Sequence, residues 1–138
     1  MKVQVIRSNR KTIGLEVRAD ESVILRAPAV DEILDVEWKS ILGEFTERVN
    51  YFCKIMEVTV GRITIRNQKT RWGSCSSKGN VNFNYQLYYM PRELMDYVII
   101  HELSHRRHMN HSAEFWQEVE KYCKTYRECR KKLRDYEI

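Results

Sequence analysis

The chain has 138 residues, of which 43% are hydrophobic and 31% charged, with only five Gly and two Pro. This composition excludes disordered and collagen-like proteins and is typical of one globular domain. The net charge is +5, no secretory signal opens the chain, and no apolar run approaches the length of a membrane span, about 18 residues. A chain of this length can fold without disulfides, and its four cysteines contain no CxxC pair. We therefore expect a cytoplasmic protein with reduced thiols and no membrane partner.

Residues 1–27 have the alternating pattern of half-buried β-strands. Apolar side chains stand at every second position in three short segments, which turn at 8–10 and at 20–21. These segments predict an antiparallel meander. After Pro28, apolar residues recur at intervals of three and four, which predicts an amphipathic helix over about 31–53.

The next segment predicts strands and a hairpin over about 58–85. A strand that starts at Val58 changes the phase of its alternation at Gly61, where a β-bulge would redirect the side chains. Further on, the pattern predicts that 71–75 and 81–85 pair as a hairpin around a polar turn.

Two helices are predicted for the rest of the chain. Pro91 suits the first turn of a helix over about 91–108, which is apolar nearly all round, as a buried helix is. Ser112 is the expected N-cap of a last helix over about 112–134. Together the elements predict one α+β domain over residues 1–138, with a small antiparallel sheet packed against a few helices.

The buried helix carries His101-Glu102-Leu103-Ser104-His105, which is an HExxH motif. Four residues of helix turn through about 400°, so both imidazoles lie on one face and can reach the same zinc ion. Glu102 then lies where its carboxylate can act on a metal-bound water. The alternative is a solvated helix face, but these polar residues interrupt the most apolar helical segment of the sequence, where an unsatisfied polar group is costly.

A catalytic zinc site needs a third protein ligand and one open position, and His108 and His111 are the candidates. His108 shares the helical face of His101 but lies about 10.5 Å further along the axis, whereas two ligands of one zinc ion lie within about 4 Å of each other. His111 can bind only if the chain reverses after His105, and the Asn and Ser that flank it favour such a reversal. We therefore favour His111 as the third ligand.

Four more residues are candidates for contact with the substrate or with the metal ligands. Arg71 and His108 are candidates for stabilising an oxyanion. The alternatives are a surface ion pair for Arg71, and for His108 either a solvated side chain or support of a metal ligand. Trp72 precedes a glycine, a pair more typical of core packing over a tight backbone than of ligand contact. Asp96 lies five residues before His101, off the ligand face, so we expect it to support a ligand or cap a helix.

Residues 58–91 contain no carboxylate but five cations. One interpretation is that these cations attract a substrate that is anionic near the scissile bond, such as an acidic peptide or a phosphate ester. The other is that they pair with the acid-rich segment 31–57. The cations are Arg62, Arg66, Lys69, Arg71 and Lys78.

Three segments carry a more specific signal: Thr70–Asn80, which contains Arg-Trp-Gly-Ser-Cys, then Asp96–His105, and then Asn110–Trp116. They closely resemble the YgjP-like metal-dependent hydrolase family, also described as zincin-like metallopeptidases related to the SprT and WLM groups. The resemblance extends to 7–13 and 26–28, so it covers nearly the whole chain.

The resemblance implies a zincin-like fold and zinc bound by His101, His105 and His111, with Glu102 as the catalytic carboxylate. In such a metallopeptidase, or metalloprotease, zinc polarises the scissile carbonyl or phosphoryl oxygen and lowers the pKa of its water to about 7, and Glu102 passes the proton to the leaving group. We expect one Zn²⁺ per chain, with another divalent transition metal as the alternative.

Three functions remain open at the level of the sequence. A metal-dependent hydrolase that acts on peptides comes first, and the hairpin strand at 71–75 could pair with an extended peptide. The second is hydrolysis of an anionic small molecule such as a nucleoside triphosphate, because some members of the family have been assigned nucleotide hydrolysis. The third is a nucleic-acid-associated binding module, although no RRM or KH signature supports it.

Overall fold

A computed structural model of the chain describes residues 3–8, 14–17, 23–28, 33–66 and 70–136, with side chains described over 39–66 and 70–136. The described strands form one sheet in the order β1-β3-β2-β4-β6-β5. The strands are β1 (Val3–Ser8), β2 (Gly14–Val17), β3 (Val23–Pro28), β4 (Ile63–Arg66), β5 (Gly73–Cys75) and β6 (Val81–Asn84). The helices are α1 (Ile33–Met56), the 3-10 helix η1 (Tyr85–Tyr89), α2 (Arg92–Ser104), α3 (Ala113–Tyr122) and α4 (Tyr126–Arg134).

The sheet is mixed, and this corrects one part of the predicted fold. The α+β class is confirmed, and β2 is antiparallel to both β3 and β4. However, β1 pairs in parallel with β3, from Val3 opposite Val23 to Ser8 opposite Pro28, and β4 is parallel to β6. The antiparallel meander is therefore wrong, because alternation shows which residues share a face but not which strand is the neighbour. The predicted turn residues 9–10 and 20–21 lie outside the described residues.

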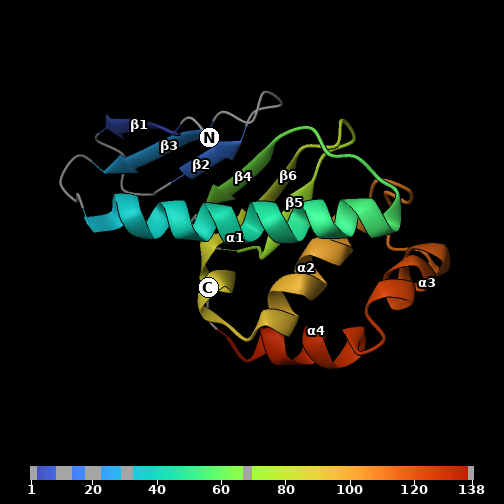
Figure 1. Ribbon diagram of the computed structural model, residues 1–138. Helices are drawn as coiled ribbons and strands as arrows, with labels where there is room; N and C mark the ends of the chain where they lie inside the picture. The colour runs from blue at the N-terminus through green and yellow to red at the C-terminus, as the bar shows by residue number, and fades with distance from the viewer. Residues whose placement is uncertain (1–2, 9–13, 18–22, 29–32, 67–69, 137–138) are drawn as a thin grey trace.

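Helix α1 confirms the amphipathic helix and extends to Met56, three residues beyond the predicted end. Its buried side chains recur at intervals of three and four, and Phe45 stacks on Phe83 of β6 with the ring centroids 5.6 Å apart. The helix therefore packs against the sheet through one apolar face. In Figure 1, α1 runs beside the strands, and the shorter helices α2, α3 and α4 lie together. The buried residues of α1 with described side chains are Ile41, Leu42, Phe45, Val49, Phe52 and Met56.

The strand predicted from Val58 is wrong, because residues 58–62 form a connection that is not a strand. Its main chain pairs with the hairpin turn instead, since the N–H of Gly61 donates to the carbonyl oxygen of Gly79 at 2.9 Å. A Cβ atom at Gly61 would lie 2.5 Å from Oδ1 of Asn80, so a larger residue here would have to displace that side chain. No β-bulge is needed at Gly61, because β4 begins only at Ile63.

The predicted hairpin is confirmed by β5 and β6, which are antiparallel, although the chain enters η1 at Tyr85. Helix α2 ends at Ser104, not near 108, because the chain turns after His105. Ser112 caps α3 as predicted, and its hydroxyl accepts the N–H of Phe115 at 3.4 Å.

The single C-terminal helix predicted over 112–134 is two helices, α3 and α4. The backbone of Cys123 leaves the helical region, and the chain turns before Tyr126. The turn lets Tyr126 stack on Trp116 of α3, with the ring centroids 5.3 Å apart. Because the apolar spacing continues with nearly the same period on both sides of the turn, the sequence pattern did not show the break.

Helix α2 is the central element of the helical part. It contacts α1, α3, α4 and the hairpin strands β5 and β6. Asp96 accepts two hydrogen bonds from Arg48 of α1, at 2.9 and 2.8 Å, and these fix the two helices to each other. In the described residues, no helix is both long and apolar enough to cross a membrane.

Candidate metal centre

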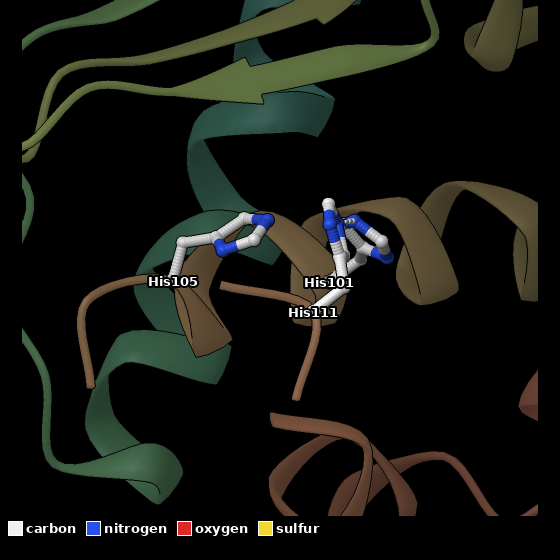
Figure 2. A group of neighbouring side chains, drawn as sticks. All are labelled: His101, His105 and His111. Atoms are coloured by element: carbon white, nitrogen blue, oxygen red, sulfur yellow. Dashed lines mark hydrogen bonds between the residues drawn. The ribbon is translucent and has the colours of Figure 1, made fainter. Parts of the chain in front are cut away.

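Three histidines meet at the C-terminal end of α2. His101 and His105 lie one turn apart on the helix, and the chain then reverses and brings His111 back immediately before α3 (Figure 2). The Nε2 atoms of His101 and His111 are 3.3 Å apart, and one ring nitrogen from each of the three residues lies within 4.8 Å of the others. Tetrahedral zinc separates its nitrogen ligands by about 3.4 Å, so this donor set fits the metal that the sequence predicts.

The imidazole of His108 does not belong to this donor set. Because α2 ends at Ser104, His108 lies in the turn, and its main-chain carbonyl oxygen is 3.0 Å from Nδ1 of His105. The part of His108 that supports the site is thus its backbone and not its imidazole. This contact was not predicted, since a main-chain group leaves no mark in the sequence.

Each helical histidine is oriented by a hydrogen bond at Nδ1. The hydroxyl of Tyr97 is 3.1 Å from Nδ1 of His101, and the carbonyl of His108 holds the ring of His105. When Nδ1 carries the proton and donates it, Nε2 is left as the ligand atom. Sequence reasoning missed Tyr97, although its place four residues before His101 on the same helix was the available signal.

Aromatic side chains of α3 pack against the histidines, of which His105 is buried and His111 exposed. Phe115 stacks on His105 with the ring centroids 4.4 Å apart, and Trp116 stacks on His111 at 6.0 Å. Burial, together with the neighbouring His105 and His111, lowers the pKa of His101 to about 3, and burial also lowers the pKa of His105. Both helical imidazoles are therefore neutral at pH 7, which is the form that binds a metal ion.

Glu102 is 6% exposed and lines the same cavity as the three histidines. Burial raises the pKa of this carboxyl to about 8, and the positive charge of Arg71 opposes the shift. A carboxyl whose pKa lies near neutrality can both accept and release a proton, as acid–base catalysis requires. The solvated helix face considered for the HExxH motif is therefore wrong for Glu102 and His105, which are buried.

The other candidates have different surroundings. Trp72 packs against the hydrophobic core, as predicted, and also lines a cavity beside Glu102. Arg71 lines both cavities next to Glu102, and within the described residues it takes part in no ion pair. Asp96 binds Arg48, so the expectation that it supports a metal ligand or caps a helix is wrong.

The ion pairs of the described part of α1 show whether its charged residues pair with the cations of residues 58–91. Within that part, the ion pairs of α1 join Glu44 to Arg92 and Arg48 to Asp96, both on α2 and outside the cationic segment. Neither of these two pairs includes a cation of residues 58–91. Lys69 lies outside the described residues.

Comparison with known proteins agrees with this geometry. The metallopeptidase zymogen of Pyrococcus abyssi abylysin has a crystal structure similar to this chain, with a TM-score of 0.56 and 26% sequence identity. The match covers 68% of this chain and 99% of that one. No curated protein sequence matches the chain. The sequence model of the YgjP-like metallopeptidase domain matches residues 4–136, and the chain therefore belongs to the YgjP-like family of metallopeptidase domains.

Proposed function

We propose that this protein is a zinc-dependent metallopeptidase that hydrolyses peptide bonds. The observation that carries the proposal is the convergence of three histidines at a cavity that Glu102 also lines. Neutral imidazoles are the ligands of many catalytic zinc sites, in which three protein ligands leave one position for water or substrate. Other divalent transition metals accept the same donors, so the identity of the metal is part of the test.

Different residues of the chain would bind the metal ion and transfer the proton. When bound, the metal ion polarises the scissile carbonyl group and lowers the pKa of a water molecule to about 7. Glu102 accepts the proton of the attacking water at its carboxylate and delivers it to the leaving amine. Tyr97 and the main chain of His108 keep the helical imidazoles in the orientation that leaves Nε2 free.

Strand β5 supports a peptide as the substrate. It stands at the end of the sheet order, so one of its edges has no strand beside it in the described structure. Gly73, Ser74 and Cys75 of this strand line the same cavity of about 270 Å³ as the three histidines. An extended peptide can add to such an edge through main-chain hydrogen bonds, which would hold it along the metal centre.

Two other functions have specific observations in their favour. Arg71, Arg130 and Arg134 line a cavity beside Glu102, and their charge would suit the phosphates of a nucleoside triphosphate. Helix α4 carries five cations, which would suit a nucleic-acid backbone. We favour the peptidase because the edge strand and the histidine cluster lie at one cavity.

A substrate screen on the metal-reconstituted protein tests the proposal. The protein is incubated with a mixture of peptides of many sequences and, separately, with nucleoside triphosphates, and Glu102→Gln serves as the blank. We expect new peptide termini in mass spectra of the wild-type reaction, and none in the blank. Phosphate or diphosphate release without peptide cleavage would favour nucleotide hydrolysis. Salt-dependent binding of nucleic acid without any metal-dependent turnover would favour the binding module.

A further inference from the structure

A second cavity adjoins the metal centre along α2. It has a volume of about 350 Å³, and it shares Arg71, Gly73, His101 and Glu102 with the cavity around the three histidines. A molecule that reaches the metal centre can therefore extend into this second cavity. Its remaining lining residues are Trp72, Tyr97, Val98, Arg130, Leu133 and Arg134.

The walls of the second cavity are largely apolar. Tyr97, Val98 and Leu133 belong to the buried core, and Trp72 packs against that core. The volume lies near the lower end of the range for small-ligand sites, roughly 300–1,000 Å³. The cavity therefore suits one apolar side chain and the groups next to it, and not a long polar chain.

Three arginines, all of them exposed, also line this cavity. Arg71 lies close enough to Glu102, the one carboxyl in the lining, for its charge to oppose the rise in the pKa of Glu102. Arg130 and Arg134 come from α4, and neither forms an ion pair within the described residues. Arg130 is held over the ring of Trp116, with its guanidinium carbon 4.4 Å from the ring centroid.

The two guanidinium groups of α4 are therefore available to a ligand that enters the cavity. Guanidinium groups bind carboxylates through paired hydrogen bonds, which give such a contact a defined geometry. The stacking of Arg130 on Trp116 restricts that side chain before any ligand arrives, so less side-chain entropy is lost on binding.

We propose that this cavity is a specificity subsite, which takes an apolar side chain beside the scissile bond while Arg130 and Arg134 bind an adjacent carboxylate. The carboxylate is either the C-terminus of a short peptide or the side chain of an acidic residue. The inference rests on the proposed peptidase function. Arg130 and Arg134 are then substrate-binding residues, whereas Glu102 and the three histidines are the reacting centre.

Matched peptides test the subsite on the metal-loaded protein. A cleaved sequence from the peptide mixture is resynthesised with Leu beside the scissile bond, and the next group is varied. One pair compares a C-terminal carboxylate with a C-terminal amide, and another compares internal Asp with internal Asn. The C-terminal pair tests the C-terminal side of the bond, and the internal Asp/Asn pair is made on each side of it. We expect kcat/KM to be about tenfold higher for at least one carboxylate peptide than for its neutral partner.

Variants of α4 connect that preference to the cavity. Arg134→Gln should reduce the preference severalfold, because kcat/KM for the carboxylate peptide falls more than kcat/KM for its neutral partner. Arg130→Gln should do the same but also removes the contact with Trp116, so Arg134→Gln is the cleaner variant. Lys131→Gln is the matched control, since it removes one charge from the same helix at a residue that does not line the cavity.

The outcomes separate the subsite from the proposed function. If the wild-type protein cleaves no peptide, the peptidase proposal fails and takes the subsite with it. If it cleaves peptides but carboxylate and neutral partners react equally, only the subsite is overturned. The subsite is also overturned if the preference for the carboxylate peptide survives in both arginine variants. The same holds if Lys131→Gln lowers this preference as much as the arginine variants do. A preference within the C-terminal pair identifies the C-terminus as the source of the carboxylate. A preference within the internal Asp/Asn pair identifies the side chain.

Discussion

Gly73 of β5 lies against Glu102 of α2 so closely that a Cβ atom added at Gly73 would be 3.1 Å from Cγ of the glutamate. The same Cβ atom would lie 3.1 Å from Cγ1 of Val98 and 3.0 Å from the carbonyl oxygen of Asn82. The edge strand and the helix can approach this closely because position 73 has no side chain. The glycine of the Arg-Trp-Gly-Ser-Cys segment thus sets the distance between the edge strand and the carboxyl group of Glu102.

Gly73→Ala should lower the hydrolytic rate without releasing the metal. The added methyl group must push either Glu102 or β5 away, and a displacement of a few tenths of an ångström disturbs proton transfer. We expect kcat to fall about tenfold or more, metal content to stay near one equivalent, and overpacking to destabilise the fold by about 1–3 kcal/mol. Steady-state kinetics, metal analysis and urea unfolding measure the three quantities.

Gly43→Ala is the control for that substitution. Gly43 lies inside α1, and a Cβ atom there would meet nothing within 4 Å. Alanine favours a helix over glycine by about 1 kcal/mol, so this variant should be slightly more stable and fully active. Equal losses of activity in both variants would contradict the specific importance of position 73.

Tyr97→Phe should weaken metal binding while the fold is kept. The substitution removes the hydroxyl that holds Nδ1 of His101, and the loss of such a partner typically lowers metal affinity 10- to 100-fold. Competition with a chelator measures the affinity. Tyr88→Phe, in the 3-10 helix η1, is the control and should change it little. An unchanged affinity in Tyr97→Phe would show that the hydroxyl does not orient the ligand.

His111→Ala and His108→Ala should differ sharply in metal binding. His111 supplies a ring nitrogen to the cluster, so its loss should lower the affinity by more than about a hundredfold. His108 supports His105 through its main-chain carbonyl, which alanine also possesses, so His108→Ala should keep the affinity within a few-fold. Metal titration of the two variants measures both affinities. A greater loss of affinity in His108→Ala than in His111→Ala would contradict the ligand set.

Asp96→Asn should destabilise the fold and leave the metal in place. Asp96 and Arg48 are only 21% and 23% exposed, and their two hydrogen bonds join α2 to α1. Loss of one charge in such a pair costs about 1–3 kcal/mol, which urea unfolding can resolve. Glu93→Gln is the control: it breaks the exposed pair with Lys132, so the stability should change little. Loss of metal in Asp96→Asn would contradict this expectation and show that Asp96 supports the metal ligands.

The parts of the site that the sequence could predict are those built from local patterns. Helix geometry alone brings His101 and His105 together, and the choice of His111 follows from the distance that separates His108 along a straight helix. The hairpin was predicted for the same reason, because its alternation and its turn are close in sequence.

The parts that could not be predicted depend on contacts between distant segments. The parallel pairing of β1 with β3 and the break after Tyr122 are set by packing partners that periodicity does not identify. The sequence pattern did not single out Arg130 and Arg134, which line a cavity with Glu102 because α4 packs on α2. Asp96 was misread because its partner, Arg48, is 48 residues away.

The most direct test of the central claim is the peptide-hydrolysis rate of Glu102→Gln at measured metal occupancy. If the three histidines bind the metal and Glu102 moves the proton, the two functions separate in this variant. We predict about one equivalent of zinc, as in the wild type, and a rate indistinguishable from that of the metal-free protein. A metal-loaded Glu102→Gln that hydrolyses peptides at the wild-type rate would contradict this division of roles.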